Sequence, residues 1–149
     1  MTDTARLLLT VAVLSVSAFG SFAWRVSRLD PSESERLIGE LRLAQWAAVL
    51  LAAAGSVSIG FAAAQVANPL GSIDVTIAVA YVLIAGIVLL REPRTALLVA
   101  AVAFLAHALV DLAHRPGLLS AELMPRWYAV GCAAWDLAVS AICFFTRRR

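Results

Sequence analysis

Lysine is absent from this sequence of 149 residues, and all twelve basic residues are arginine. A retinal Schiff base or a pyridoxal phosphate linkage needs a lysine amine, so both mechanisms are excluded. Charged residues make up only 15% of the chain, and its net charge is +2. The arginines lie at the ends of apolar segments rather than on one basic face, so the sequence predicts no nucleic-acid binding.

Cysteine is also scarce, because the chain has only Cys132 and Cys143. Both fall in the last apolar segment, where eleven residues of one helix separate them by roughly 16 Å. A disulfide needs its two Cα atoms within about 7 Å. We therefore expect no disulfide within the chain, and the two cysteines do not indicate a redox compartment.

The sequence is rich in apolar residues: 62% of the chain is hydrophobic, and its mean hydropathy is +0.87. A soluble domain of this length cannot bury so much apolar surface. The sequence predicts an all-α integral membrane protein, a single domain over residues 1–149 with five transmembrane helices and the lipid bilayer as its partner. The predicted spans are about residues 7–24, 43–64, 73–90, 95–114 and 126–146.

The first apolar segment follows a six-residue head and resembles a cleaved signal peptide. Its apolar run continues to Trp24, however, and then meets Arg25 and Arg28. This stop-transfer pattern favours an uncleaved helix.

Residues 25–42 form the most strongly charged loop of the chain. The run from Asp30 to Glu33 is typical of a helix start, with a capping Asp and a Pro at the first helical position. Two alternatives follow for the rest of the loop. It forms a solvated linker that runs into the next span, or a short helix that lies on the membrane surface through Leu37, Ile38 and Leu41.

The distribution of arginine predicts how the helices are oriented. Nine arginines lie on the side that holds the loop 25–42, the turn 91–94 and the C-terminus, whereas three lie on the other side. Because basic residues favour the cytoplasmic side, the N-terminus is predicted outside and the C-terminus inside. The expected location is the inner membrane of a bacterium, with 25–42 as a cytoplasmic loop. Cleavage of the first segment would not change the orientation of the other four spans.

Small residues recur every four positions along the second segment, at Ala48, Ala52, Ser56, Gly60 and Ala64. In lipid, small residues let two helix backbones approach closely. We therefore expect this small-residue stripe to pack against a neighbouring helix. The run from Asn68 to Gly71 predicts the turn that follows.

Two of the predicted spans carry ionisable residues well inside their apolar stretch. In one span His107, Asp111 and His114 lie at i, i+4 and i+7 and share one helical face. The last span has polar residues at every fourth position: Tyr128, Cys132, Asp136 and Ser140. A charge at membrane depth costs several kcal/mol unless it is paired, so these residues are candidates for a functional site.

Helix geometry predicts that several of these side chains meet at one depth. At about 1.5 Å per residue, His107 lies level with the interval between Cys132 and Asp136, and Tyr81 reaches the same layer. The prediction is a polar pocket in the outer half of the bundle that opens outward. No arginine shares the helix face of Asp136, so this carboxyl group needs a partner or a proton, and we expect it to be coupled to His107.

Four kinds of chemistry fit this pocket. The first is a divalent metal as cofactor, which would be held by His107, Asp111, His114 and Asp136. Haem is disfavoured, since both histidines lie on one helix and bis-His ligation would need a second protomer. A ligand site or proton relay would use His107, Asp111, Asp136, Tyr81, Cys132 and Tyr128. In the fourth alternative, His107 and Asp136 only hydrogen-bond to each other and hold two helices together.

The pattern of these residues resembles a group of small bacterial membrane proteins of unknown function. The resemblance covers the last third of the chain and rests on His107-x3-Asp111-x2-His114, then Pro125-Arg126-Trp127-Tyr128, then Cys132-x3-Asp136. It implies no activity, substrate or cofactor. The alanine-rich, lysine-free composition is also similar to that of proteins from bacteria with GC-rich genomes. Membrane metal-hydrolases likewise gather His and Asp from several spans, but this chain is short and lacks their other motifs.

Three functions therefore stay open. The one that we favour is binding of a small ligand or ion in an outward-facing intramembrane His/Asp pocket. The second is a non-catalytic structural or assembly subunit of a membrane complex, docked on a partner membrane subunit or on a second copy of the chain. The third is a metal-dependent membrane hydrolase, so the sequence leaves open whether the protein is an enzyme.

Overall fold

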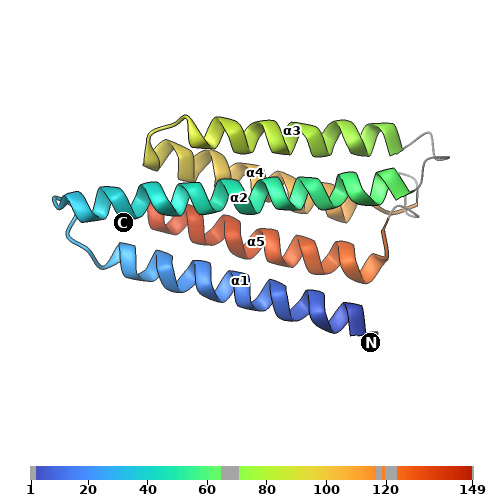
Figure 1. Ribbon diagram of the computed structural model, residues 1–149, viewed down its shortest axis with the longest axis horizontal. Helices are drawn as coiled ribbons and strands as arrows, with labels where there is room; N and C mark the ends of the chain where they lie inside the picture. Colours follow the sequence, from blue (N-terminus) through green and yellow to red (C-terminus); the bar gives the residue numbers. More distant parts are fainter. Residues whose placement is uncertain (1–2, 65–70, 117–118, 120–123, 149) are drawn as a thin grey trace.

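The computed structural model describes residues 3–64, 71–116, 119 and 124–148, and these residues form five α-helices and no strand. The helices are α1 (Asp3–Ser27), α2 (Ser34–Ala64), α3 (Gly71–Leu89), α4 (Pro93–Ala113) and α5 (Arg126–Arg148). They lie side by side along one long axis, with the two termini at opposite ends (Figure 1). The predicted all-α bundle of five helices is confirmed. The turn predicted from Asn68 to Gly71 lies largely outside the described residues.

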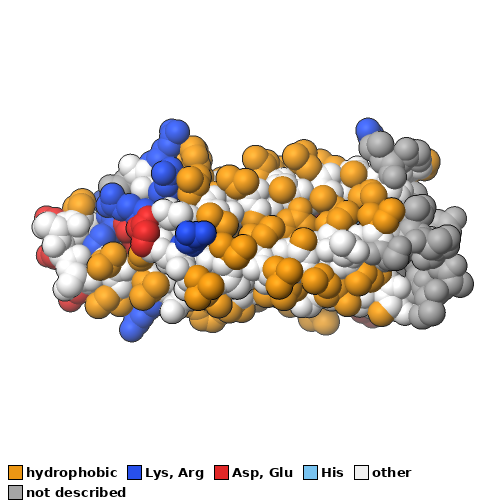
Figure 2. Space-filling view, turned by 90° about the horizontal axis from the view of Figure 1, so that it is seen from above, with side chains coloured by type: hydrophobic (Ala, Val, Ile, Leu, Met, Phe, Trp, Pro, Cys, Tyr) orange, Lys and Arg blue, Asp and Glu red, His pale blue; other side chains and the backbone are white. Residues whose placement is uncertain are grey.

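Four of these helices, α1, α2, α4 and α5, are long and apolar enough to cross a membrane. The apolar part of α3, Ile73–Leu89, is shorter. The whole helix has 19 residues and extends about 28 Å, which is similar to the thickness of the hydrocarbon core of a bilayer. Hydrophobic side chains cover the middle of the bundle, while arginine and acidic side chains gather at one end (Figure 2). These lengths and this surface are those of a multi-pass membrane protein.

α4 is the central helix of the bundle. It packs along α5 and also contacts α2 and α3, whereas α1 lies at the edge against α5 and α2 (Figure 1). Half of the apolar stretch of α4 is buried inside the protein, against 11% of that of α1. The large side chains with almost no exposure include Phe104, Leu43, Leu51, Leu97, Val88 and Val139. A polar side chain on the inner face of α4 is therefore shielded from lipid and from bulk solvent.

α2 begins much earlier than the predicted second span. It runs without interruption from Ser34 to Ala64, so 31 residues form one helix about 46 Å long. Its first turns extend past the ends of the neighbouring helices (Figure 1). Residues 34–42 are thus the beginning of α2, and they form neither a separate surface helix nor a flexible linker.

The predicted helix start at Asp30 is also wrong, because Asp30 closes a turn instead. Its Oδ1 atom accepts hydrogen bonds from the hydroxyl of Ser32 at 2.6 Å and from the backbone N–H of Ser32 at 2.8 Å. These two bonds to the charged form lower the pKa of Asp30. The first helical residue is Ser34, three positions after the proline.

A buried ion pair explains why the charged stretch is helical and packed. Nε of Arg36 lies 2.8 Å from Oε1 of Glu40, one turn along α2, and each side chain is only 3% exposed. Nη1 of Arg36 donates to the carbonyl oxygen of Leu29 at 3.1 Å, which holds the beginning of the α1–α2 connection against α2. Nε of Arg94 approaches the second Glu40 oxygen at 3.5 Å. A solvated linker was one of the two alternatives that the sequence left open for this stretch, and these two charges are instead an internal contact.

The close approach of α2 to α3 occurs at Gly55. The C-terminal part of the predicted small-residue stripe is exposed. A Cβ atom on Gly55 would lie 2.8 Å from the carbonyl oxygen of Ala78. The stripe residues Ser56, Gly60 and Ala64 are exposed, and nothing lies within 4 Å of a Cβ built on Gly60. The four-residue spacing of the stripe drifts around the helix, because an α-helix has 3.6 residues per turn.

The N-terminus of α4 is capped by Glu92. Its carboxylate accepts a hydrogen bond from the backbone N–H of Thr95 at 2.9 Å and another from the Thr95 hydroxyl. Pro93 occupies the first turn, where its missing N–H costs no helical bond. Hydrogen bonds from the Thr95 hydroxyl and then from its backbone lower the pKa of Glu92.

Candidate functional site

Three ionisable side chains meet inside the bundle at the interface between α4 and α5. His107 and Asp111 lie one turn apart on the inner face of α4, and Asp136 faces them from α5. Their exposed fractions are 4%, 2% and 0%. α4 can bury two polar residues because it is enclosed by three other helices. We call His107, Asp111 and Asp136 the central site.

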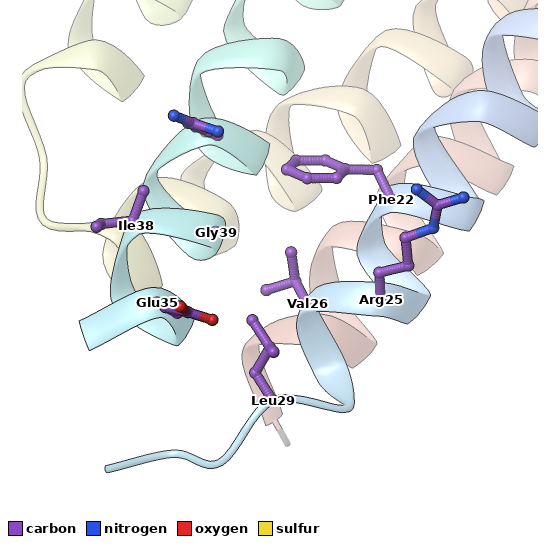
Figure 3. Close-up of a pocket in the computed structure, with 8 residues that line it drawn as sticks. Phe22, Arg25, Val26, Leu29, Glu35, Ile38 and Gly39 are labelled. Atoms are coloured by element: carbon purple, nitrogen blue, oxygen red, sulfur yellow. The ribbon is translucent and has the colours of Figure 1, made fainter. Parts of the chain in front are cut away.

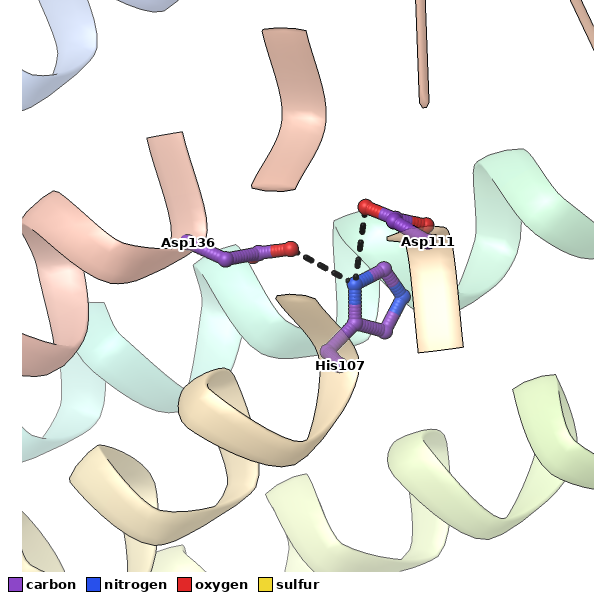
Figure 4. Close-up of side chains that lie close together, drawn as sticks. All are labelled: His107, Asp111 and Asp136. Carbon is purple, nitrogen blue, oxygen red and sulfur yellow. Dashed lines mark hydrogen bonds and ion pairs between the residues drawn. The ribbon is translucent and has the colours of Figure 1, made fainter. Parts of the chain in front are cut away.

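One ring nitrogen of His107 contacts both carboxylates (Figure 4). Nδ1 lies 2.7 Å from Oδ2 of Asp136 and 3.6 Å from Oδ2 of Asp111. A nitrogen and an oxygen at 2.7 Å need a proton between them, so Nδ1 of His107 or Oδ2 of Asp136 carries one. The second ring nitrogen of His107 points away from both carboxylates (Figure 4).

Two oxygens of the central site have no hydrogen-bond partner among the described residues. They are Oδ2 of Asp111 and Oδ1 of Asp136, and both are buried. One ligand atom from each of the three residues lies within 4.8 Å of the other two. An imidazole nitrogen with two carboxylates is a donor set that suits divalent metals such as Mn²⁺, Fe²⁺ or Zn²⁺. The central site therefore has the donors and the unmet hydrogen-bonding capacity that a cation would satisfy.

The other predicted pocket residues surround this centre to different degrees. The Tyr81 ring of α3 packs edge-on against the His107 ring, with centroids 4.6 Å apart. Tyr128 and Cys132 lie one turn apart on α5, where their side chains interact. Tyr128 also contacts Phe61 of α2, with ring centroids 5.1 Å apart. Tyr81 is thus in direct contact with the central site, whereas Tyr128 and Cys132 lie farther toward the beginning of α5.

His114 is separate from the central site, although it shares a helix face with His107 and Asp111. Its Nε2 atom lies 3.2 Å from Oδ1 of Asp74 on α3. α4 ends at Ala113, so His114 caps the helix rather than continuing its inner face. The predicted set of four metal ligands is therefore divided, with three residues together and His114 paired elsewhere.

The sequence did not indicate that Asp74 belongs to a site. It lies in the first turn of α3, a position where a carboxylate is ordinarily an exposed helix-end residue. The available signal was the presence of two histidines and three acidic residues in the predicted spans and at their ends. Only the packing of α3 against α4 shows that Asp74 is buried beside His114.

A groove also lies at the other end of the bundle. It is an open groove of about 340 Å³ between the end of α1 and the beginning of α2 (Figure 3). Phe22, Val26 and Leu29 line it from α1 and the residues that follow. Gly39 provides the close approach there, since a Cβ on it would lie 2.8 Å from a Val26 methyl. The groove shares no residue with the central site.

The chain was compared with models of known protein families, with curated proteins and with solved structures. None of the three comparisons found a match.

Proposed function

We propose that this protein binds a small cation, most suitably a divalent metal ion, at the central site within the membrane. The observation that carries the proposal is that the carboxylates of Asp111 and Asp136 flank one imidazole nitrogen and that each has a buried oxygen without a hydrogen-bond partner among the described residues. A buried polar atom without a partner costs free energy. A cation bound between the three residues would remove that cost and would neutralise the negative charge of the two carboxylates.

The hydrogen bond between His107 and Asp136 holds a proton that a bound cation could replace. A cation that takes Nδ1 as a ligand replaces the proton held between Nδ1 and Oδ2 of Asp136. Binding would therefore release protons and would weaken as the pH falls. The Tyr81 ring, packed on the imidazole, would keep His107 in the orientation that points Nδ1 at the carboxylates.

The proposed location is a bacterial inner membrane, with the N-terminus outside and the C-terminus in the cytoplasm. The nine-to-three division of arginines between the two sides of the predicted membrane protein supports this orientation. In this orientation the central site lies in the outer half of the membrane. A reporter that is active only in the cytoplasm should be active when it is fused after Arg149. Activity of a reporter restricted to the periplasm at the same position would reverse the orientation.

Metal analysis of the full chain tests the proposal directly. The chain has two histidines, which provide a matched pair of variants. Wild type purified in mild detergent and incubated with Zn²⁺ or Mn²⁺ should retain a stoichiometric ion after desalting. His107→Ala removes one of three ligands and should abolish retention, whereas His114→Ala should leave it unchanged. Equal loss in both variants, or no retention by wild type, would contradict the proposal.

A second candidate is a purely structural role for the same residues. The observation in its favour is the 2.7 Å contact, which already gives His107 and Asp136 a direct partner each. A shared proton between two helices stabilises a bundle without any ligand. Absence of bound metal in wild type, together with unfolding of His107→Ala, would favour this alternative.

A further inference from the structure

A second His–Asp pair lies between the central site and the end of the bundle where α3 begins. Nε2 of His114 approaches Oδ1 of Asp74 at 3.2 Å, and the two side chains are only 4% and 2% exposed. Nδ1 of His114 lies 3.0 Å from the carbonyl oxygen of Val110, which can only accept, so Nδ1 carries a proton. A further proton must then lie between Nε2 and Asp74. We call Asp74 and His114 the outer pair.

One carboxylate oxygen of the outer pair accepts no hydrogen bond from the described residues. Oδ2 of Asp74 is buried and has no hydrogen-bond partner among the residues that the structure describes. The carboxylate is therefore half satisfied, by His114 on one oxygen only. A buried carboxylate oxygen of this kind is ordinarily satisfied by an ordered water or a cation.

A small cavity joins the outer pair to the central site. It lies between α2, α3 and α4, and its lining includes Asp74 and His114 at one end and Tyr81 and His107 at the other. Its volume of about 10 Å³ is close to the ~10–15 Å³ that one water molecule needs. Ser58 of α2 adds a hydroxyl to the wall. A water-sized space with this many polar groups is suited to hold water, because a water needs two to four partners.

The positions along α4 agree with a short connection. His107 and His114 are seven residues apart, which is about 10 Å along the helix axis. The ring of His107 lines the cavity, and its second nitrogen points away from both carboxylates of the central site (Figure 4). One water molecule that donates a hydrogen bond to Oδ2 of Asp74 would continue the line of polar groups from the outer pair toward His107.

We propose that the outer pair of Asp74 and His114 is the outer binding position of a hydrated path that leads to His107. The path passes the water-sized cavity between Ser58, Ala78 and Tyr81. The outer pair and the cavity are the observations that support the hydration of the path, and this part does not depend on the proposed function. Its use by a cation rests on the proposed function of the central site.

Hydrogen exchange at the imidazole C2 position measures whether water reaches His107. The experiment uses the full-length, metal-free protein in nanodiscs transferred to D₂O, with both histidines assigned by mass spectrometry. We expect His107 to exchange within about tenfold of His114, although both are buried. Exchange at His107 slower than at His114 by about 100-fold or more would show a dry site and overturn the path.

Two serines of α2 give a matched pair for blocking the path. Ser58 lines the cavity, whereas Ser56 is exposed, and each hydroxyl hydrogen-bonds to the backbone carbonyl one turn earlier. Ser58→Leu should fill the cavity and slow exchange at His107 by about tenfold or more, while Ser56→Leu leaves it unchanged. Equal rates in the two variants would overturn the path. The wild-type comparison decides the question even if Ser58→Leu does not fold.

Uptake of Mn²⁺ tests the use of the path by a cation. Asp74→Asn removes the outer charge but keeps the size of the side chain. It should slow Mn²⁺ uptake by about fivefold or more and leave the final stoichiometry unchanged, because the central ligands are intact. Equal uptake rates would overturn the role of the outer pair. A wild type that exchanges at His107 yet binds no Mn²⁺ would reject cation binding at the central site and retain the hydrated path.

Discussion

Nδ1 of His107 on α4 lies 2.7 Å from Oδ2 of Asp136 on α5, and the two residues are 29 positions apart in the chain. Both residues are almost completely buried, at 4% and 0% exposure. The contact ties the central helix to α5 in the middle of an apolar bundle. Loss of either partner leaves the other without its hydrogen bond inside the bundle.

A double-mutant cycle measures this relationship. His107→Gln and Asp136→Asn should each destabilise the protein by about 3–5 kcal/mol, since each leaves a buried partner unpaired. The double variant should cost less than the sum, with a coupling energy of about 1–3 kcal/mol. The measurement is unfolding in mixed detergent micelles, followed by circular dichroism. As a control, His114→Gln combined with Asp136→Asn should be additive within about 0.5 kcal/mol. Additivity in the first cycle would contradict a shared hydrogen bond.

Glycine at position 55 should be needed for the packing of α2 against α3. Gly55→Ala places a Cβ 2.8 Å from the carbonyl oxygen of Ala78, and backbone atoms must move to relieve the contact. The expected destabilisation is about 1–3 kcal/mol, measured by thermal unfolding in detergent. Gly60→Ala is the matched control, because a Cβ there meets nothing within 4 Å. Similar melting of the two variants would show that the helices separate more easily than the structure indicates.

Arg36 should contribute more to stability than the exposed arginines near it. Arg36→Met leaves Glu40 buried, with Arg94 at 3.5 Å as its remaining charged partner. Breaking a buried ion pair costs about 3–5 kcal/mol, and the bond from Arg36 to Leu29 is lost as well. Arg42→Met, on the same helix and exposed, should cost far less. An equal cost for both variants in detergent unfolding would mean that the Arg36–Glu40 pair adds no net stability.

The cap of α4 should weaken in acid. Hydrogen bonds from Thr95 lower the folded-state pKa of Glu92 below its ordinary value of 4.5. The cap therefore stabilises the folded state fully above pH 4.5 and is lost as the pH falls through the lower folded-state pKa. Amide-exchange protection in the first turn of α4, corrected for intrinsic rates, should fall between pH 5 and pH 3. Glu92→Gln does not titrate and should lose this dependence. The same decrease in Glu92→Gln would assign the effect to another group.

The helices and the depth of the central site were predictable from local properties of the sequence. Apolar runs of membrane-spanning length predict helices because the backbone must satisfy its hydrogen bonds internally in lipid. The fixed rise of 1.5 Å per residue then gives the depth of each side chain. This reasoning was sufficient to predict that His107, Asp136 and Tyr81 lie in one layer, and the structure confirms their proximity.

Rotation and contact between helices were not predictable in the same way. Depth leaves open which way a helix faces, so His114 was grouped with the central site although it pairs with Asp74. Four-residue spacing likewise suggested a seam at Gly60, whereas the close approach is at Gly55.

The formation of apolar helices, and the similar depth of two carboxylates and a histidine within them, could therefore be predicted from the sequence. These properties follow from composition and helical rise, which depend on neighbouring residues only. Which carboxylate each histidine contacts, and that Arg36 and Glu40 are internal, follow only from the packing of the helices. Such pairings depend on the rotation of each helix about its axis, and that rotation is set by the simultaneous packing of α4 against α2, α3 and α5.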